Sequence, residues 1–232
     1  MKKFLIGIMI VVLPTSIFGI GGIGLQIGQG SVTVGATEDA RVLDVGITAI
    51  TANMTTTEFS NPLSVGLHVY IDAIPFIDLE ADINLVGQKY EFGFNNPAEI
   101  GPYKFGWASA SNYFTVRKKI LGLGIPFLAK ANLFYGGGYN QHMVTPLMTI
   151  DLMEEMMGGD LGADPTNITE QELIDFLDDN KLETSGFHIQ TGLQFKVLVL
   201  DTFLFYRHTF AEDLIPGEKA FGSVNLRIGV GI

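Results

Sequence analysis

The 232-residue sequence contains no cysteine, which excludes disulfide bonds, thiolate metal sites and cysteine nucleophiles. Basic residues are scarce, with 14 Lys and Arg against 25 Asp and Glu, and the formal net charge is −11. A sequence-independent nucleic-acid binder needs a basic face, so we expect no nucleic-acid partner. Charged residues make up only 17% of the chain and hydrophobic residues 47%, a composition too apolar for a disordered protein.

Recognised catalytic and metal-binding motifs are also missing. The sequence has no HExxH, GxSxG, P-loop or Rossmann fingerprint. Its histidines occur singly, at His68, His142, His188 and His208. We therefore expect no catalytic residues, no cofactor and no metal site, and we expect the protein not to be an enzyme.

The longest apolar run lies at the N-terminus. Lys2 and Lys3 precede ten apolar residues, 4–13, and small residues follow. This order is typical of a secretory signal peptide, and the run is too short for a membrane-spanning helix, which takes about 20 residues. We expect a signal peptide over 1–19, cleaved near Gly19, and one domain over 20–232. That domain has no run of 18 apolar residues, which leaves an apolar soluble fold or a β-barrel.

Alternating apolar and polar residues dominate the rest of the chain. In 221–232 the apolar residues share one face of a strand, and small or polar residues such as Arg227 share the other. The same two-residue period recurs upstream and predicts eight strands, although its phase is less regular in two of them, 105–119 and 201–210. The other six are 23–35, 64–72, 77–86, 127–135, 187–197 and 221–232.

The connections between these strands differ in length. Short links are 73–76, 121–126 and 199–200, and long links are 36–62, 95–104, 140–184 and 211–219. Short turns at one end and long loops at the other are typical of outer-membrane barrels. Because the number of strands is even, both termini are expected at the short-turn end.

On these features, the sequence over about residues 22–232 resembles the small eight-stranded outer-membrane β-barrel proteins of Gram-negative-type bacteria. Its last strand resembles their C-terminal assembly signal through Val224, Leu226, Ile228 and Val230. The resemblance implies an all-β fold, an antiparallel eight-stranded transmembrane β-barrel with short periplasmic turns and a long, partly helical external loop. It also implies a location in the bacterial cell outer membrane, contact with outer-membrane lipid and lipopolysaccharide, and insertion by the barrel-assembly machinery.

In such a barrel the apolar faces meet lipid, so we expect Val224, Leu226, Ile228 and Val230 to face outward. The lumen of eight strands is just wide enough for side chains to fill it. An unpaired buried charge costs several kcal/mol, so we expect a lumen polar network that joins the acidic strand 77–86 to basic residues on other strands. The expected members are Asp72, Asp78, Glu80, Asp82, Arg117, Lys130, Lys196 and Arg227.

Residues 140–184 break the alternation. Thr145-Pro146 opens a helix-like run that Gly158-Gly159 ends, and Thr169 with Glu172 forms the capping box of a second helix. Between 151 and 183 there are eleven acids and one lysine. We expect a large acidic external loop that serves as a solvated cap or contacts an external partner.

Three functions remain open at this point. The first is a non-enzymatic structural or surface-interaction protein whose lumen is plugged by the charge-paired network. The second is a narrow pore or transporter for small or apolar solutes, gated by the 140–184 loop. The third is a soluble periplasmic ligand-binding β-protein, in which the apolar faces would point inward.

Overall fold

A computed structural model describes residues 21–44, 49–72, 77–94, 101–125, 128–159 and 169–231, so the predicted signal peptide lies outside the described residues. Eight long strands run through the molecule: β1 (Gly21–Ser31), β6 (Leu63–Ile71), β7 (Asp78–Phe94), β8 (Tyr103–Ile125), β9 (Ala129–Val144), β10 (Leu182–Val197), β11 (Leu200–Ile215) and β12 (Glu218–Gly231). The remaining elements are β2 (Thr33–Val34), β3 (Glu38–Asp44), β4 (Ala49–Thr56), β5 (Phe59–Ser60), α2 (Ile150–Met156) and α3 (Glu170–Asp179). Neither helix has the length and hydropathy that crossing a membrane requires.

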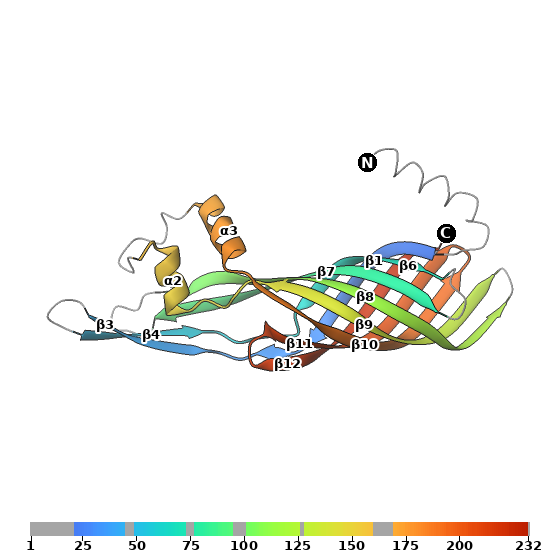
Figure 1. Cartoon of the computed structure of the whole chain (residues 1–232), viewed down its shortest axis with the longest axis horizontal. Coiled ribbons are helices and arrows are strands. Elements are labelled where there is room, and N and C mark those ends of the chain that lie inside the picture. Colours follow the sequence, from blue (N-terminus) through green and yellow to red (C-terminus); the bar gives the residue numbers. More distant parts are fainter. Residues whose placement is uncertain are drawn as a thin grey trace.

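The eight long strands form a closed antiparallel ring (Figure 1). Each strand pairs with the long strands before and after it in the sequence, and β1 closes the ring against β12, with Gly22 opposite Gly231. The pairing confirms the predicted eight-stranded antiparallel β-barrel.

The register of the ring shows how strongly the strands tilt. A row of paired residues that starts at Ile125 of β8 passes through all eight strands and returns to β8 at Phe114, eleven positions up the same strand. One of those positions belongs to the register shift between Lys119 and Leu121. A closed sheet with such a stagger must tilt its strands steeply against the barrel axis, typically by about 35–45°.

The two ends of the barrel differ, as expected. β1 begins and β12 ends at the short-turn end, whereas α2, α3 and the β3–β4 hairpin lie at the loop end (Figure 1). Several barrel strands continue further toward the loop end than the alternation indicated. The segment between β9 and β10 is therefore 145–181 rather than 140–184.

One of the predicted long links is wrong, and another contains strands of its own. Residues 211–219 are not a loop, because β11 and β12 continue past a register shift and meet at a tight turn over 216–217. Residues 36–62 contain the β3–β4 hairpin, and β4 adds to the upper edge of β7 through the pairs Met54–Phe94 and Thr56–Phe92. Backbone hydrogen bonding thus extends the barrel wall beyond the ring.

Of the two helices in 145–181, α2 begins later than the sequence indicated and α3 begins where it indicated. The first starts after Thr149, whose hydroxyl caps Leu152 N–H, because Thr145 instead pairs with the backbone of Ala108. The second has the predicted capping box. The N–H and hydroxyl of Thr169 donate to Glu172, and these bonds hold the pKa of that exposed carboxyl below its usual value.

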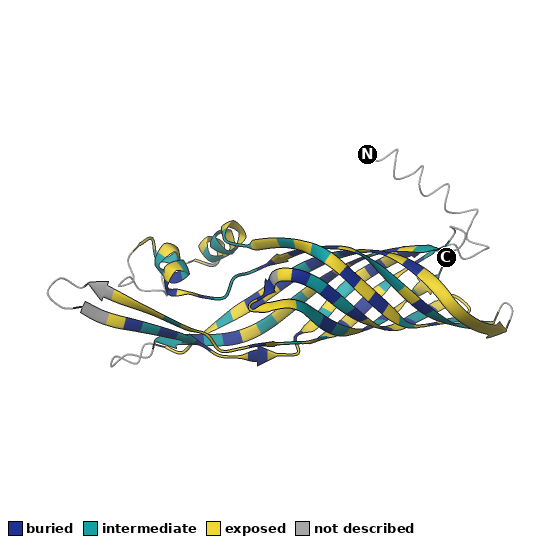
Figure 2. Ribbon diagram, turned by 60° about the horizontal axis from the view of Figure 1, so that its bottom comes forward, coloured by how far each residue is buried: buried dark blue, intermediate teal, exposed yellow. Residues whose placement is uncertain are grey.

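Buried and less buried residues alternate along much of each barrel strand (Figure 2), whereas residues 118–125 of β8 are all exposed. In the middle of the barrel the outward set is mainly apolar on all eight strands, and the inward set is polar. Toward the loop end the interior becomes apolar. There α2 and the connections between the strands enclose a core that includes Val34, Met54, Phe59, Trp107, Val144, Met148, Ile150, Met153 and Leu214.

Close strand packing explains one glycine of β9. A Cβ atom on Gly138 would lie 1.8 Å from the carbonyl oxygen of Phe114, and a backbone atom cannot move aside as a flexible side chain can. We expect Gly138→Ala to lower the free energy of unfolding in lipid vesicles by about 1–3 kcal/mol, the usual cost of overpacking. Gly87 of β7 is the matched control, since a Cβ there has open space, and Gly87→Ala should leave stability unchanged. Equal denaturant midpoints for both variants would contradict this close contact.

Candidate functional site

The centre of the lumen is built on β7. Glu80 and Asp82 stand two residues apart, so both point inward, and their side chains are fully buried. Asn84 follows on the same face and donates to Asp82 Oδ1 at 2.6 Å. One strand thus carries two carboxylates into an interior that has no room for a hydration shell.

Asp82 binds two arginines from the far side of the barrel. Arg207 of β11, the strand opposite β7 in the ring, donates through both Nη atoms, at 2.9 Å to Oδ1 and 2.7 Å to Oδ2. Arg227 of β12 donates through Nη2 to Oδ2 at 2.6 Å. These bonds cross the lumen, and bidentate charge-assisted bonds are the strong kind.

Glu80 is held by ion pairs with two arginines and by one hydrogen bond. Its carboxylate oxygens lie 2.8 Å from Arg117 Nη1 and 3.1 Å from Arg227 Nη1. Gln190 of β10 donates a hydrogen bond to it, at 2.8 Å. Three guanidinium groups therefore share two carboxylates at the centre of the barrel.

Aromatic rings surround the excess positive charge. The guanidinium of Arg117 lies 4.0 Å from the ring centre of Phe134, and that of Arg207 lies 3.9 Å from the ring centre of Tyr113. Desolvated cation–π contacts of this kind stabilise by about 2 kcal/mol. The rings also fill the lumen beside the charges.

A second charge cluster lies nearer the short-turn end. Lys196 Nζ is 3.7 Å from Asp72 and 3.8 Å from Asp201, and Tyr70 donates its hydroxyl to Asp201. Asp78 lies at the same end and accepts from Arg117 at 3.1 Å.

Of the eight residues predicted for the lumen network, the structure places seven in these ion pairs. Lys130 is the exception. It pairs in register with Lys196 and so takes an inward position, but it is exposed near the short-turn end and forms no ion pair with a described residue. Sequence reasoning missed Arg207 and Asp201, which lie on a strand whose phase was unclear. It also missed the neutral hydrogen-bonding residues that join the network, namely Gln26, Asn84, Gln190, Gln194 and Asn225.

The four residues predicted to face lipid lie on the outward face of β12. Val224, Ile228 and Val230 are each about half exposed, at 54%, 50% and 49%. Leu226 lies on the same face and is partly covered.

The loop end of the lumen is closed by the segment that contains α2. Met148, Ile150 and Met153 are buried in the apolar core, and Met148 N–H donates to the hydroxyl of Tyr90 at 2.9 Å. Asp39 of β3 accepts from Ile150 N–H at 2.8 Å. Above the charge network, an apolar layer therefore fills the same barrel.

One interior group resembles a nucleophile relay. Ser111 Oγ lies 2.7 Å from His142 Nδ1, and His142 Nε2 lies 2.9 Å from Asn140 Oδ1. A hydroxyl, an imidazole and an orienting amide in this order can activate a nucleophile. However, Ser111 lines a cavity of only about 50 Å³, which holds water but not an ester substrate. In the described part of the chain, no cluster of carboxylates and imidazoles is placed to hold a metal ion.

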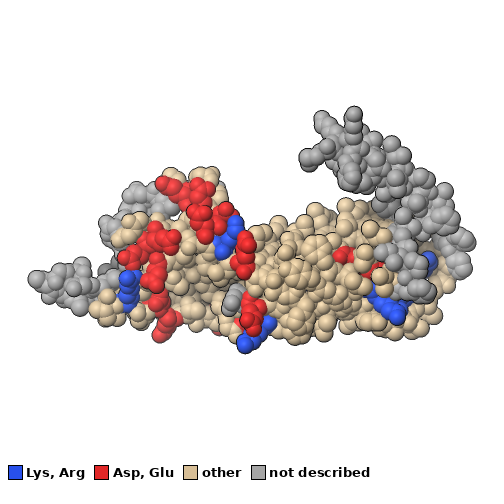
Figure 3. Space-filling model, viewed as in Figure 1, with Lys and Arg blue, Asp and Glu red and all other residues tan. Residues whose placement is uncertain are grey.

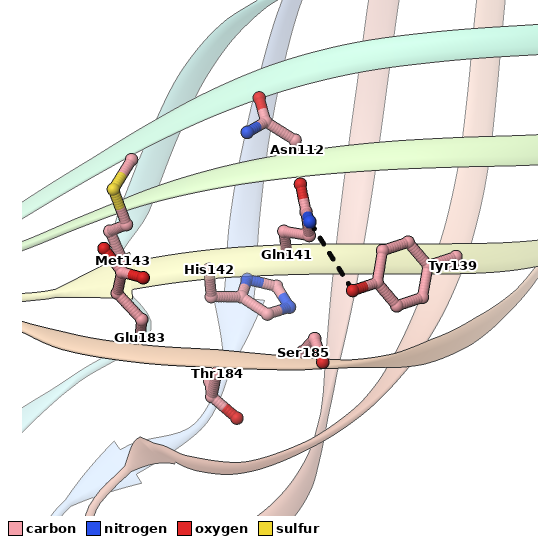
Figure 4. A pocket seen from close by; sticks show the side chains of 8 residues that line it. All are labelled: Asn112, Tyr139, Gln141, His142, Met143, Glu183, Thr184 and Ser185. Carbon is pink, nitrogen blue, oxygen red and sulfur yellow. Dashed lines mark hydrogen bonds between the residues drawn. The ribbon is translucent and has the colours of Figure 1, made fainter.

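The exterior carries two further features. Acidic side chains gather at the loop end, around α2 and α3, and the barrel wall beside them is nearly free of charge in this view (Figure 3). On the outer face of β8, β9 and β10 there is a hollow of about 340 Å³ that contains Gln141 and Tyr139 (Figure 4).

No family model matches the sequence, and no curated protein matches it. Several solved structures are similar to this chain over most of its length. Outer membrane protein OprG from Pseudomonas aeruginosa has 8% identity and a TM-score of 0.43, over 91% of this chain and 92% of its own. Neisserial surface protein A has 10% identity and a TM-score of 0.39, over 91% and 97%. Ail, the attachment invasion locus protein of Yersinia pestis, has 11% identity and a TM-score of 0.38, over 91% and 95%. The strand pairing of this chain makes it an eight-stranded antiparallel β-barrel, and its structural neighbours are small bacterial outer-membrane barrel proteins.

Proposed function

We propose that the protein is a bacterial outer-membrane β-barrel with a plugged lumen and a non-enzymatic structural or surface-interaction role. The outward apolar wall supports the membrane location. Soluble monomers rarely expose contiguous apolar patches above a few hundred Å². Here large apolar side chains are exposed on every strand of the ring, including Ile23, Leu25 and Ile27, Val65, Leu67 and Val69, Ile83 and Leu85, Val116, Tyr135, Ile189, Leu204, and Val224 and Ile228.

The same orientation argues against a soluble periplasmic binding protein. Such a protein would keep its apolar residues inside and its charges in water. In this chain Glu80, Asp82 and Arg227 are inside, and the apolar face is outside. Only a hydrocarbon surrounding makes that distribution favourable.

The proposed location sets the orientation and the partners. A signal peptide over 1–19 would deliver the chain across the inner membrane, the barrel-assembly machinery would insert it, and lipid with lipopolysaccharide would surround it. The loop end would then lie outside the cell. Its exposed acidic side chains, such as Glu155, Asp175 and Asp178, are where we place contact with an external partner.

The proposal that the lumen is plugged is supported by two barriers, one above the other, inside the barrel. Asp82 bridges to Arg207 on the opposite strand, and an apolar layer around Met148 and Met153 lies above that bridge. An ion that crosses the barrel would have to break buried ion pairs and then pass an apolar core. Both steps carry high costs in free energy.

Conductance tests this proposal. We expect residues 20–232, refolded into a planar lipid bilayer, to insert and to give a silent baseline, with a general-diffusion porin in the same lipid as the positive control. Discrete and reproducible current steps from the wild type would contradict the plug. They would instead favour the narrow pore, with the 145–181 segment as its gate.

A further inference from the structure

The hollow on the outer wall is formed by three adjacent strands near the loop end (Figure 4). Its position follows from the alternation, because Gln141 and Tyr139 of β9 belong to the outward set while Asn140 and His142 belong to the inward set. Its lining consists of Asn112, Tyr139, Gln141, His142, Met143, Glu183, Thr184 and Ser185.

The hollow begins where the apolar wall ends. Register pairing aligns Phe114, Tyr139, Phe187 and Phe210 as one outward aromatic row over β8, β9, β10 and β11. Phe187 and Phe210 stack, with ring centres 4.5 Å apart. Outward aromatic rows mark the water–membrane interface in barrels.

The next outward row toward the loop end is polar. It contains Asn112, Gln141 and Ser185, again aligned by register across β8, β9 and β10. The hollow therefore opens at the height of the lipid headgroups on the external side. Because it faces away from the lumen, a membrane lipid is the molecule placed to enter it.

The lining favours a hydroxyl-rich headgroup. Amide and hydroxyl side chains offer both donors and acceptors, as sugars require. Asn112 belongs to the outward set, and its side chain makes no hydrogen bond to any other residue that the structure describes, so it is available to a ligand. The ring of Tyr139 and the thioether of Met143 supply apolar contact for the hydrocarbon side of a sugar ring.

The charge of the lining excludes phosphate as the group that is recognised. Glu183 is the one charged residue among the eight, and neither lysine nor arginine is present. Phosphate sites are normally built from arginine, lysine or helix N-termini, and a carboxylate repels a phosphate. A neutral sugar or an amino sugar fits this charge.

We propose that the hollow binds the sugar headgroup of a membrane glycolipid through its neutral hydroxyl or amine groups. This inference rests on the membrane location proposed above and adds a site and a ligand class to it. Gln141 lies between Asn112 and Ser185 in the polar row, and both flanking strands can contribute bonds to the same headgroup.

Native mass spectrometry can test the site with defined lipids. The barrel is refolded into phosphatidylcholine nanodiscs that contain either monogalactosyl diacylglycerol or phosphatidylglycerol, and lipid adducts retained after release are counted. We expect the wild type to retain the galactolipid over phosphatidylglycerol. We expect Gln141→Leu and Asn112→Leu each to reduce galactolipid retention about five- to tenfold, which corresponds to about 1 to 1.4 kcal/mol.

Gln29→Leu is the matched control, because Gln29 is an exposed outward residue at the loop end of β1, outside the hollow. It should retain galactolipid like the wild type. Methyl galactoside separates the two sources of the sugar: we expect it to compete only weakly, at millimolar concentration, because it lacks the lipid anchor, whereas competition at micromolar concentration would mean that free saccharide is the ligand and would overturn the lipid assignment. Equal retention by Gln141→Leu and wild type, or preferred retention of phosphatidylglycerol, would overturn the site. Failure of the wild type to insert into any bilayer would instead contradict the proposed function.

Discussion

Asp82→Ala is expected to lower the free energy of unfolding in lipid vesicles by about 3–5 kcal/mol, the usual cost of removing one partner from a buried ion pair. Asp82 accepts from Arg207 at 2.7 and 2.9 Å and from Arg227 at 2.6 Å, and its side chain is fully buried. Without it, Arg207 would lose its ion pair, and Arg227 would keep only its contact with Glu80. Urea unfolding followed by tryptophan fluorescence of Trp107 measures the change.

Asp78→Ala is the matched control for this change. Asp78 is on the same strand and pairs with Arg117, but its side chain is 18% exposed at the short-turn end, where water replaces the lost partner. We expect it to cost about 0–1 kcal/mol. A second control separates lost charge from lost packing: Asp82→Leu combined with Arg207→Met replaces the pair by apolar groups and should recover much of the loss. If Asp82→Ala unfolded at the same urea concentration as Asp78→Ala, the central network would not stabilise the barrel.

Much of the barrel could be predicted from the sequence because its two faces differ so clearly. In β7, Leu79, Ile83 and Leu85 point to one side and Asp78, Glu80 and Asp82 to the other, a contrast that only a wall between two unlike surroundings explains. The four candidate lipid-facing residues of β12 could be predicted for the same reason, because apolar and polar residues alternate there too. Charge pairing across the lumen then followed from the need to neutralise buried charge.

The inward and outward faces of β11 could not be told apart from the sequence over residues 203–206. Its inward set contains Phe203 and Phe205 and its outward set contains Leu204 and Tyr206, so both faces are apolar and the period-two contrast disappears. Arg207 and Asp201 could therefore not be assigned to the lumen. Phe203 and Phe205 are inside because they pack against arginine guanidinium groups, a contact that strand periodicity cannot reveal.

The apolar core at the loop end was hidden for a different reason. Val34, Phe59, Trp107 and Met148 come from four separate segments of the chain. Val34 and Trp107 lie near the loop ends of predicted strands, and Phe59 and Met148 lie in predicted links. Each contributes one side chain to a space that exists only when the connections fold together, so the pattern of any single segment does not reveal the core. For Lys130 the alternation correctly predicted the inward face. It could not predict how far along the barrel axis the residue lies, and Lys130 is exposed near the short-turn end.

Charged substitutions at two heights on the outer wall test which part of β12 lies in the membrane. Leu226→Arg places a guanidinium on the outward face of β12, in register between Ile27 and Leu204, which are 55% and 48% exposed. We expect the free energy of unfolding in lipid vesicles to fall by about 2–4 kcal/mol, because an arginine near the midplane of a bilayer must be desolvated or must distort the lipid around it. Glu218→Arg adds the same side chain to the exposed loop end of the same strand, where the expected cost is about 0–1 kcal/mol. A large difference between the two variants would locate β12 in the membrane with its loop end in water. Equal stabilities in lipid would mean that hydrocarbon does not cover this face, and the outer wall would then need a protein partner to cover it.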